Sequence, residues 1–162
     1  QYPDIEIVRN SLFQKICSKS AKLLTLEIKP NSTILMPDDN FICELLLEPY
    51  TRKYGANLVY EGDYDLKVNP LILDDKVNTI FEGIFSGEGL NLIDGENEIY
   101  PLANVSLDWI NSFLEMDGQE LIECENKNEL ANSFSEFLED VAPQFRENVI
   151  SASKFIDSKN KN

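Results

Sequence analysis

Carboxylates are the one class of reactive side chain that this chain holds in surplus, with 29 Asp and Glu among 162 residues. Paired acids could carry out glycoside hydrolysis or bind Mg²⁺ or Ca²⁺. The candidate pairs are Asp38-Asp39, Asp63 with Asp65, Asp74-Asp75, and the run from Asp94 to Glu98. None has the order of acids and glycine found in a calcium loop, and a single Trp offers few platforms for a sugar ring. We therefore interpret these pairs as solvated loop residues and predict no metal and no cofactor.

Histidine is absent from the sequence, which excludes His-based catalytic triads and His-bearing zinc sites. The three cysteines, Cys17, Cys43 and Cys124, are too few for a four-Cys zinc site and lie far apart in apolar surroundings. They are typical of small core residues in a reducing cytoplasm. The glycines between residues 83 and 95 lack the Lys-Ser/Thr step of a phosphate loop, which favours turns. We therefore expect a cytoplasmic protein that is not an enzyme.

Nearly all the net charge of −15 lies between residues 82 and 140, where fifteen acids accompany one base, Lys127. Nucleic-acid binding requires clustered Lys and Arg, so this charge disfavours it. An acidic surface instead suits a basic protein partner, because the field between the two accelerates association. The alternative explanation is that the acids only keep the protein soluble.

Two acidic segments are the candidate partner-binding residues. The first combines acids with tyrosines, which anchor interfaces at a low entropy cost. The second is a loop and strand whose exposed positions are nearly all acidic. The two segments are formed by Tyr60, Glu61, Asp63, Tyr64 and Asp65, and by Glu115, Asp117, Glu120 and Glu123. Ordinary exposed surface is the alternative for both. We assign Trp109, Phe134 and Phe137 to the core instead.

Apolar spacings of three and four residues predict amphipathic helices near both ends of the chain. The predicted helices cover residues 4–22, 38–48, 106–117, 126–141 and 143–156. Pro49 removes a backbone donor, so we expect the second helix to stop near Glu48 or to kink there. The polar residues 157–162 are expected to fray.

Short β-type runs separated by turn residues occupy the middle of the chain. They cover residues 23–28, 33–36, 57–60, 65–68, 71–73, 79–85, 90–93, 98–102 and 119–124. Asp94-Gly95 is a hairpin signal between two of them. We predict one α+β domain, residues 1–156, with a central, mostly antiparallel sheet framed by N-terminal and C-terminal helices. No apolar run reaches the roughly 20 residues of a membrane span, so no membrane partner is expected.

The segment Leu130–Leu138 reads Leu-Ala-Asn-Ser-Phe-Ser-Glu-Phe-Leu and follows the predicted strand Leu121–Cys124. This combination resembles the closing strand and helix of the SUKH superfamily, whose helix reads Ala-x-Ser-Phe-x-x-Phe-Leu. The resemblance implies an α+β domain. For many bacterial members of that superfamily it also implies an immunity protein, which neutralises a toxin delivered by neighbouring cells.

The leading hypothesis is an acidic, stoichiometric binding protein, an immunity protein that occludes a basic surface or active site of a toxin domain. The alternative is a secretion chaperone or adaptor, which would bind an effector as a dimer and expose apolar grooves. Oligomeric state, monomer or dimer, separates the two. A carboxylate-based enzyme is the third hypothesis and requires two acids converging in a deep pocket.

Overall fold

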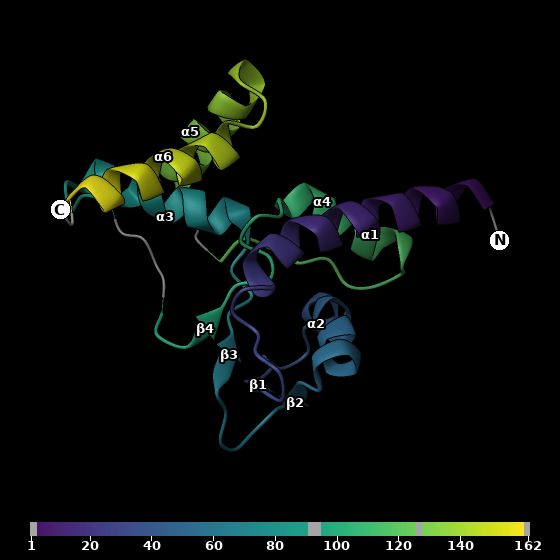
Figure 1. The fold of residues 1–162 in the computed structure, drawn as a ribbon. Helices are drawn as coiled ribbons and strands as arrows, with labels where there is room; N and C mark the ends of the chain where they lie inside the picture. Colours follow the sequence, from purple (N-terminus) through teal and green to yellow (C-terminus); the bar gives the residue numbers. More distant parts are fainter. Residues whose placement is uncertain (1–2, 91–94, 126–127, 161–162) are drawn as a thin grey trace.

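The computed structural model describes residues 3–90, 95–125 and 128–160, with residues 126–127 and 91–94 as the internal gaps. The described residues form six helices and one small four-stranded sheet (Figure 1). In chain order the elements are α1 (Pro3–Leu24), β1 (Thr33–Leu35), α2 (Phe41–Tyr54), β2 (Asn57–Val59), β3 (Leu66–Val68), α3 (Leu73–Ser86), β4 (Glu98–Ile99), α4 (Leu107–Met116), α5 (Glu129–Val141) and α6 (Phe145–Asn160). Within this described part, no helix is long and apolar enough to cross a membrane.

The direction of the strands differs from the predicted fold class. Its strand order is β2-β1-β3-β4, and every neighbouring pair is parallel. The prediction of a central, mostly antiparallel sheet is therefore wrong, and the protein is mostly helical. Parallel strands need crossover connections, which α2 supplies between β1 and β2 and α3 supplies between β3 and β4.

Helix α3 is the main reason for this error. The predicted run 79–85 lies within α3, and the run 71–73 ends at its first residue, Leu73. The sequence predicts strands here because Val, Ile, Thr and Phe favour strands in isolation. In the fold, residues 71–78 are all buried, whereas Glu82, Ile84 and Phe85 in the second half of α3 are exposed. The packing of α3 against α5 and α6 overrides the local preference of these residues for a strand.

Helix α2, residues 119–124 and helix α6 also depart from the expected elements, and one predicted turn lies partly outside the described residues. Helix α2 continues through Pro49 to Tyr54 and is ended by Gly55, whose left-handed conformation (φ 65°) lets its N–H donate to the carbonyl of Thr51. Residues 119–124, predicted as a strand, follow an irregular path. Of the predicted hairpin at Asp94-Gly95, Asp94 lies outside the described residues. Helix α6 extends to Asn160, into the segment expected to fray.

Two hydrophobic clusters hold the molecule together. The larger one lies between α1, α2, α4 and the sheet and includes the fully buried Ile16, Ile34, Leu47 and Ile110. The smaller one is formed where α3 packs against α5 and α6. Figure 1 shows this helical trio at the upper left, the sheet with α2 at the bottom, and α1 with α4 at the right of the view. Helix α3 joins the two parts, because it leaves the sheet after β3 and ends among the C-terminal helices.

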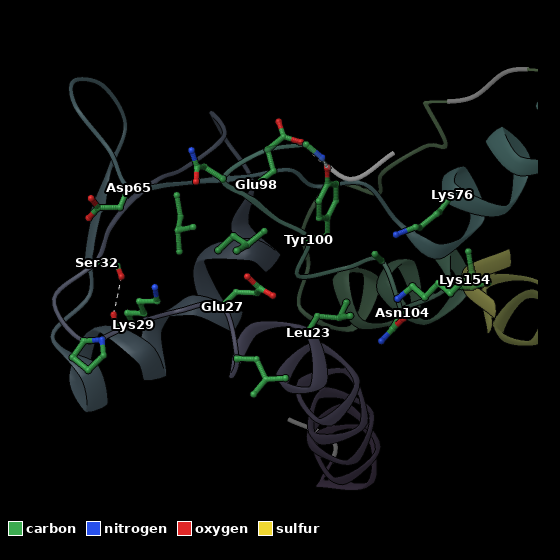
Figure 2. A pocket seen from close by; sticks show the side chains of 18 of the residues that line it. Leu23, Glu27, Lys29, Ser32, Asp65, Lys76, Glu98, Tyr100, Asn104 and Lys154 are labelled. Carbon is green, nitrogen blue, oxygen red and sulfur yellow. Dashed lines mark hydrogen bonds between the residues drawn. The ribbon is translucent and has the colours of Figure 1, made fainter. Parts of the chain in front are cut away.

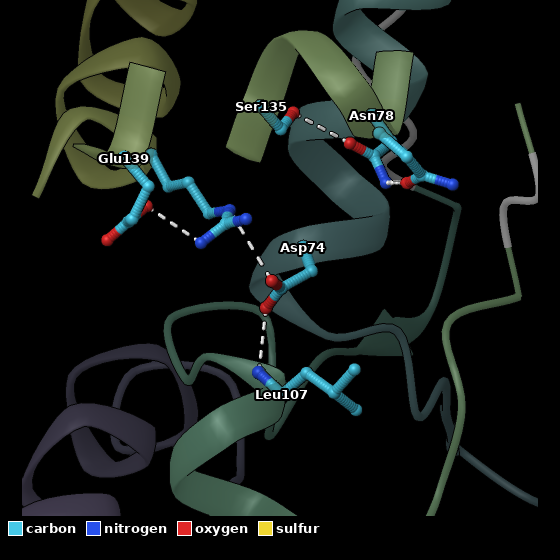
Figure 3. Close-up of polar contacts among 7 residues, drawn as sticks. Asp74, Asn78, Leu107, Ser135 and Glu139 are labelled. Atoms are coloured by element: carbon cyan, nitrogen blue, oxygen red, sulfur yellow. Dashed lines mark hydrogen bonds and ion pairs between the residues drawn. The ribbon is translucent and has the colours of Figure 1, made fainter. Parts of the chain in front are cut away.

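The carboxylate of Asp74 connects α3 to three other helices (Figure 3). Its Oδ2 atom accepts a hydrogen bond from the backbone N–H of Leu107 at 2.7 Å and so caps α4 from another helix. Its Oδ1 atom lies 3.4 Å from Nε of Arg146 on α6. Arg146 in turn donates to Glu139 of α5 at 2.7 Å. Asp74 is buried, with 8 % of its surface exposed, so these charges interact with little screening by water.

Asp74→Ala is expected to lower the free energy of unfolding by about 3 kcal/mol or more, because it leaves the partly buried Arg146 with one carboxylate and α4 without its cap. Asp74→Asn keeps an acceptor for Leu107 and should cost less. Urea unfolding curves measure both losses. The matched control is Asp108→Ala, an exposed acid in the first turn of α4, which should cost less than about 1 kcal/mol. Equal losses for Asp74→Ala and Asp108→Ala would contradict this role of Asp74.

Candidate functional site

The first predicted segment, residues 60–65, forms the connection between β2 and β3. Tyr60 and Tyr64 are exposed, as are the acids of the loop. The Tyr60 hydroxyl donates to the carboxylate of Glu44 on α2, and this hydrogen bond raises the pKa of Tyr60. Asp65 has a structural contact, since its Oδ2 atom accepts the backbone N–H of Thr33 at 2.8 Å.

The second predicted segment follows α4. Glu115, Glu120 and Glu123 are exposed, whereas Asp117 forms an ion pair with Arg9 of α1. The loop after α4 is held by the side chain of Asn111, which donates to the carbonyl of Ile122 and accepts its N–H, both at 2.9 Å. These two hydrogen bonds imitate the pairing of a neighbouring strand, although no strand forms at 119–124.

Part of each predicted segment borders the beginning of α2. Glu120 lines a hollow together with Asp39, Asn40 and Phe41. The Tyr60 hydroxyl donates a hydrogen bond to Glu44 in the first turn of α2. Glu115, Asp117 and Asp65 lie elsewhere. Acids near a helix N-terminus are stabilised by the positive end of the helix dipole. The acids around α2 therefore have a structural explanation as well as the predicted binding role.

The apolar stripe of α5 is a surface that the sequence reasoning missed. Leu130, Phe134, Phe137 and Val141 follow one another at spacings of four, three and four, which places them on one helix face. They are 63 %, 37 %, 61 % and 65 % exposed. The assignment of Phe134 and Phe137 to the core is therefore wrong.

The opposite face of α5 explains why this stripe faces outward. The fully buried Ala131 allows α5 to approach α3 closely. The hydroxyl of Ser135 donates to Oδ1 of Asn78 at 2.9 Å, and Nδ2 of Asn78 donates to Asn132 (Figure 3). A small and polar face thus satisfies the buried Asn78 of α3. The sequence signal for this arrangement is the combination of small and amide residues beside the apolar stripe.

A row of acids accompanies the stripe along α5. Glu129, Glu136 and Asp140 are exposed and are separated by seven and four residues, so they form a second line on the helix. The stripe also continues onto α3. The Phe134 ring packs edge-on against Phe81 and Phe85, with centroid distances of 5.1 and 5.5 Å. Ile84 and Phe85 of α3 are 50 % and 44 % exposed. We call Leu130, Phe134, Phe137, Val141, Ile84 and Phe85 the α5 face.

A cavity of about 790 Å³ lies on another side of the molecule, where the strands begin. Glu98 of β4 lines it and accepts hydrogen bonds from the Tyr100 hydroxyl at 2.6 Å and from Nδ2 of Asn69 at 3.2 Å. The hydrogen bond from Tyr100, followed by the one from Asn69, lowers the pKa of Glu98. The Tyr100 hydroxyl also accepts the N–H of Gly95 at 2.7 Å, so it fixes both sides of this turn.

The cysteine thiols are held in environments that disfavour the reactive thiolate. Burial raises the pKa of Cys43 to about 12. The pKa of Cys124 is also raised to about 12, first by burial and then by the neighbouring carboxylates of Asp75 and Asp74. Burial raises the pKa of Cys17 as well. Among the residues that the structure describes, no three Cys, Asp or Glu side chains are grouped so that they could hold a metal ion.

Comparison of the chain with models of known protein families gives no match, and comparison with curated protein sequences gives none either.

Alkylation of Cys124 by iodoacetamide at pH 8 is expected to be at least about tenfold slower in the folded protein than in urea, because the raised pKa leaves little thiolate. Its rate should keep rising with pH beyond the ordinary thiol pKa of 9.0. Mass spectrometry of the alkylated peptides measures each cysteine separately, and the urea sample is the control. A rate that levels off near pH 9 in the folded protein would contradict the raised pKa.

Tyr100→Phe is expected to raise the pKa of Glu98, because it removes the strongest hydrogen bond to the ionised carboxylate. Because the pKa of Glu98 is lowered in the folded wild type, its ionised carboxylate stabilises the fold at pH values above the ordinary pKa of 4.5. That contribution is lost as the pH falls through the lower, folded value. An NMR titration of the Glu98 carboxyl carbon measures the shift. Tyr64→Phe, at an exposed tyrosine, is the control, and an unchanged Glu98 titration in Tyr100→Phe would refute the assignment.

Proposed function

We propose that this chain is a non-catalytic, stoichiometric binding protein for a basic protein partner, and that the α5 face docks an amphipathic segment of that partner. The observation that carries this proposal is the exposed apolar stripe of α5 with the acidic row Glu129, Glu136 and Asp140 along it. A partner helix or loop with apolar residues next to Lys or Arg would complement both lines at once.

The energetics favour docking at this face over the acidic segments alone. Burying one large apolar side chain contributes about 1.5–3 kcal/mol, whereas an exposed ion pair contributes about 0–1 kcal/mol. The stripe offers four large apolar side chains on one helix. The acids would then act mainly on the rate of association and on the choice of partner, because charges attract at long range.

The specific form that we propose is an immunity protein that neutralises a bacterial toxin domain. Two observations support it. The segment that carries the resemblance to the SUKH superfamily, residues 130–138, lies within α5, and its Leu130, Phe134 and Phe137 are exposed. The acids around the beginning of α2, with Tyr60, are a second surface that could meet a basic cleft.

An adaptor or secretion chaperone is the second candidate, and the same exposed stripe favours it. Such a protein holds an unfolded or amphipathic segment of a client, for which an open apolar face is suited. The two forms differ in the partner's state. An immunity protein binds a folded toxin and stops its activity, whereas a chaperone dimer binds a secreted client without inhibiting an enzyme.

Co-purification with the tagged chain tests the proposal, with one basic partner expected at a one-to-one ratio. Phe137→Ser should weaken that complex by about 30-fold, because central aromatic residues carry much of the energy of an interface. Ile7→Ser is the matched control at an exposed apolar residue of α1 and should leave affinity unchanged. Surface plasmon resonance measures both complexes.

Neutralising the acidic row by Glu129→Gln, Glu136→Gln and Asp140→Asn should slow association and reduce its dependence on salt up to about 0.5 M. The comparison variant is Glu61→Gln with Asp63→Asn, in the loop before β3. If the comparison variant slows association and the α5 variants do not, the docking site lies at the beginning of α2. If none of these variants affects the complex, electrostatic recognition by this chain is refuted.

A further inference from the structure

Lysines gather at the cavity where the strands begin, although acids outnumber bases by 29 to 14 in the chain. Lys29, Lys76 and Lys154 all line it. They come from three separate places: the segment after α1, the first part of α3, and α6. The fold brings these lysines to one cavity from distant parts of an acidic chain, with Lys29 at the other end of the cavity from Lys76 and Lys154 (Figure 2).

Two of these lysines point to the same end of the cavity (Figure 2). The side chains of Lys76 and Lys154 extend toward one region, beside Asn104 and the ring of Tyr100. Lys76 is 6 % exposed, and its Nζ atom lies 5.5 Å from the centre of the Tyr100 ring. An ammonium group that is fixed and largely removed from water attracts an anion more strongly than an exposed one.

The acids of the same cavity are engaged in holding the fold. Glu98 accepts from Tyr100 and Asn69, and Asp65 accepts from the backbone of β1. Glu27, the third acid, lies toward the other end of the cavity in Figure 2. By contrast, the Lys154 ammonium and the Asn104 amide have no hydrogen-bond or ion-pair partner within the described ranges of the chain. Donors are therefore available at one end of the cavity.

We propose that this end of the cavity binds a small molecule through an anionic group, a phosphate or a carboxylate. Lys154 and the Asn104 amide would donate to the anion's oxygens, and Lys76 would supply a second positive charge. The body of the molecule would extend past the Tyr100 ring, within a space of about 790 Å³ that matches the usual size of small-molecule sites. This site is separate from the α5 face and does not depend on the proposed protein partner.

An NMR titration of the ¹⁵N-labelled chain with inorganic phosphate, and separately with succinate, tests the site. Sodium chloride at equal ionic strength is the reference. Saturable shifts are expected for the backbone amides of Asn104, Lys76 and Lys154. Lys154→Gln and Asn104→Ala should each weaken the affinity about tenfold, the usual effect of losing one hydrogen bond to a charged group. Lys159→Gln, an exposed lysine on the same helix outside the cavity, should leave it unchanged.

Saturation by phosphate alone would assign the site to phosphorylated ligands, and saturation by succinate would assign it to carboxylates. The proposal is overturned if neither anion shifts these amides beyond sodium chloride. It is also overturned if Lys159→Gln weakens binding as much as Lys154→Gln, since that would mean attraction to α6 in general. Circular dichroism melts of the variants confirm that they are folded, which is expected because Lys154 is exposed.

Discussion

The buried carboxylate of Asp74 is the interaction on which the arrangement of the helices depends. It caps α4 through Leu107, and it pairs with Arg146, which also reaches Glu139. Three other helices, α4, α5 and α6, are thereby fixed relative to α3. A buried charge tolerates few alternative arrangements, because any structure that separates Asp74 from its partners leaves a desolvated charge uncompensated.

Helix α3 carries Asp74 and connects the sheet to the C-terminal helices. Ile72, the residue before α3, lies in the larger cluster beside the sheet, and α3 itself packs against α5 and α6 in the smaller cluster. The connection through α3 supplies the crossover that the parallel pairing of β3 and β4 requires. Because Asn78 of α3 needs polar partners, the face of α5 with Asn132 and Ser135 turns inward. The exposed aromatic stripe of α5 and the lysine-lined cavity are both consequences of where α3 runs.

The acidic segments, the α5 stripe and the cavity differ in how far the sequence could predict them. The acids and tyrosines at 60–65 and 115–123 are exposed, as composition indicated. Asp117 is the exception, because it forms an ion pair with Arg9. The α5 stripe was recognised as an apolar helix face but assigned to the core, because periodicity identifies a face without saying whether anything covers it. The cavity had no sequence signal at all, since Lys29, Lys76 and Lys154 are separated by dozens of residues.

The sequence by itself determined the properties that depend on composition and local spacing. These are the exclusion of histidine chemistry, the acidic balance, and the helices near both ends of the chain, whose apolar residues recur at the helical period. The tertiary structure decided the direction of the strands, which face of α5 is buried, and the placement of Lys29, Lys76 and Lys154 around one cavity. Each of these rests on contacts between distant residues, such as Asp74 with Arg146 and Asn78 with Ser135. A local pattern cannot encode such contacts, because it records spacing along one element and not which distant residue will lie against it.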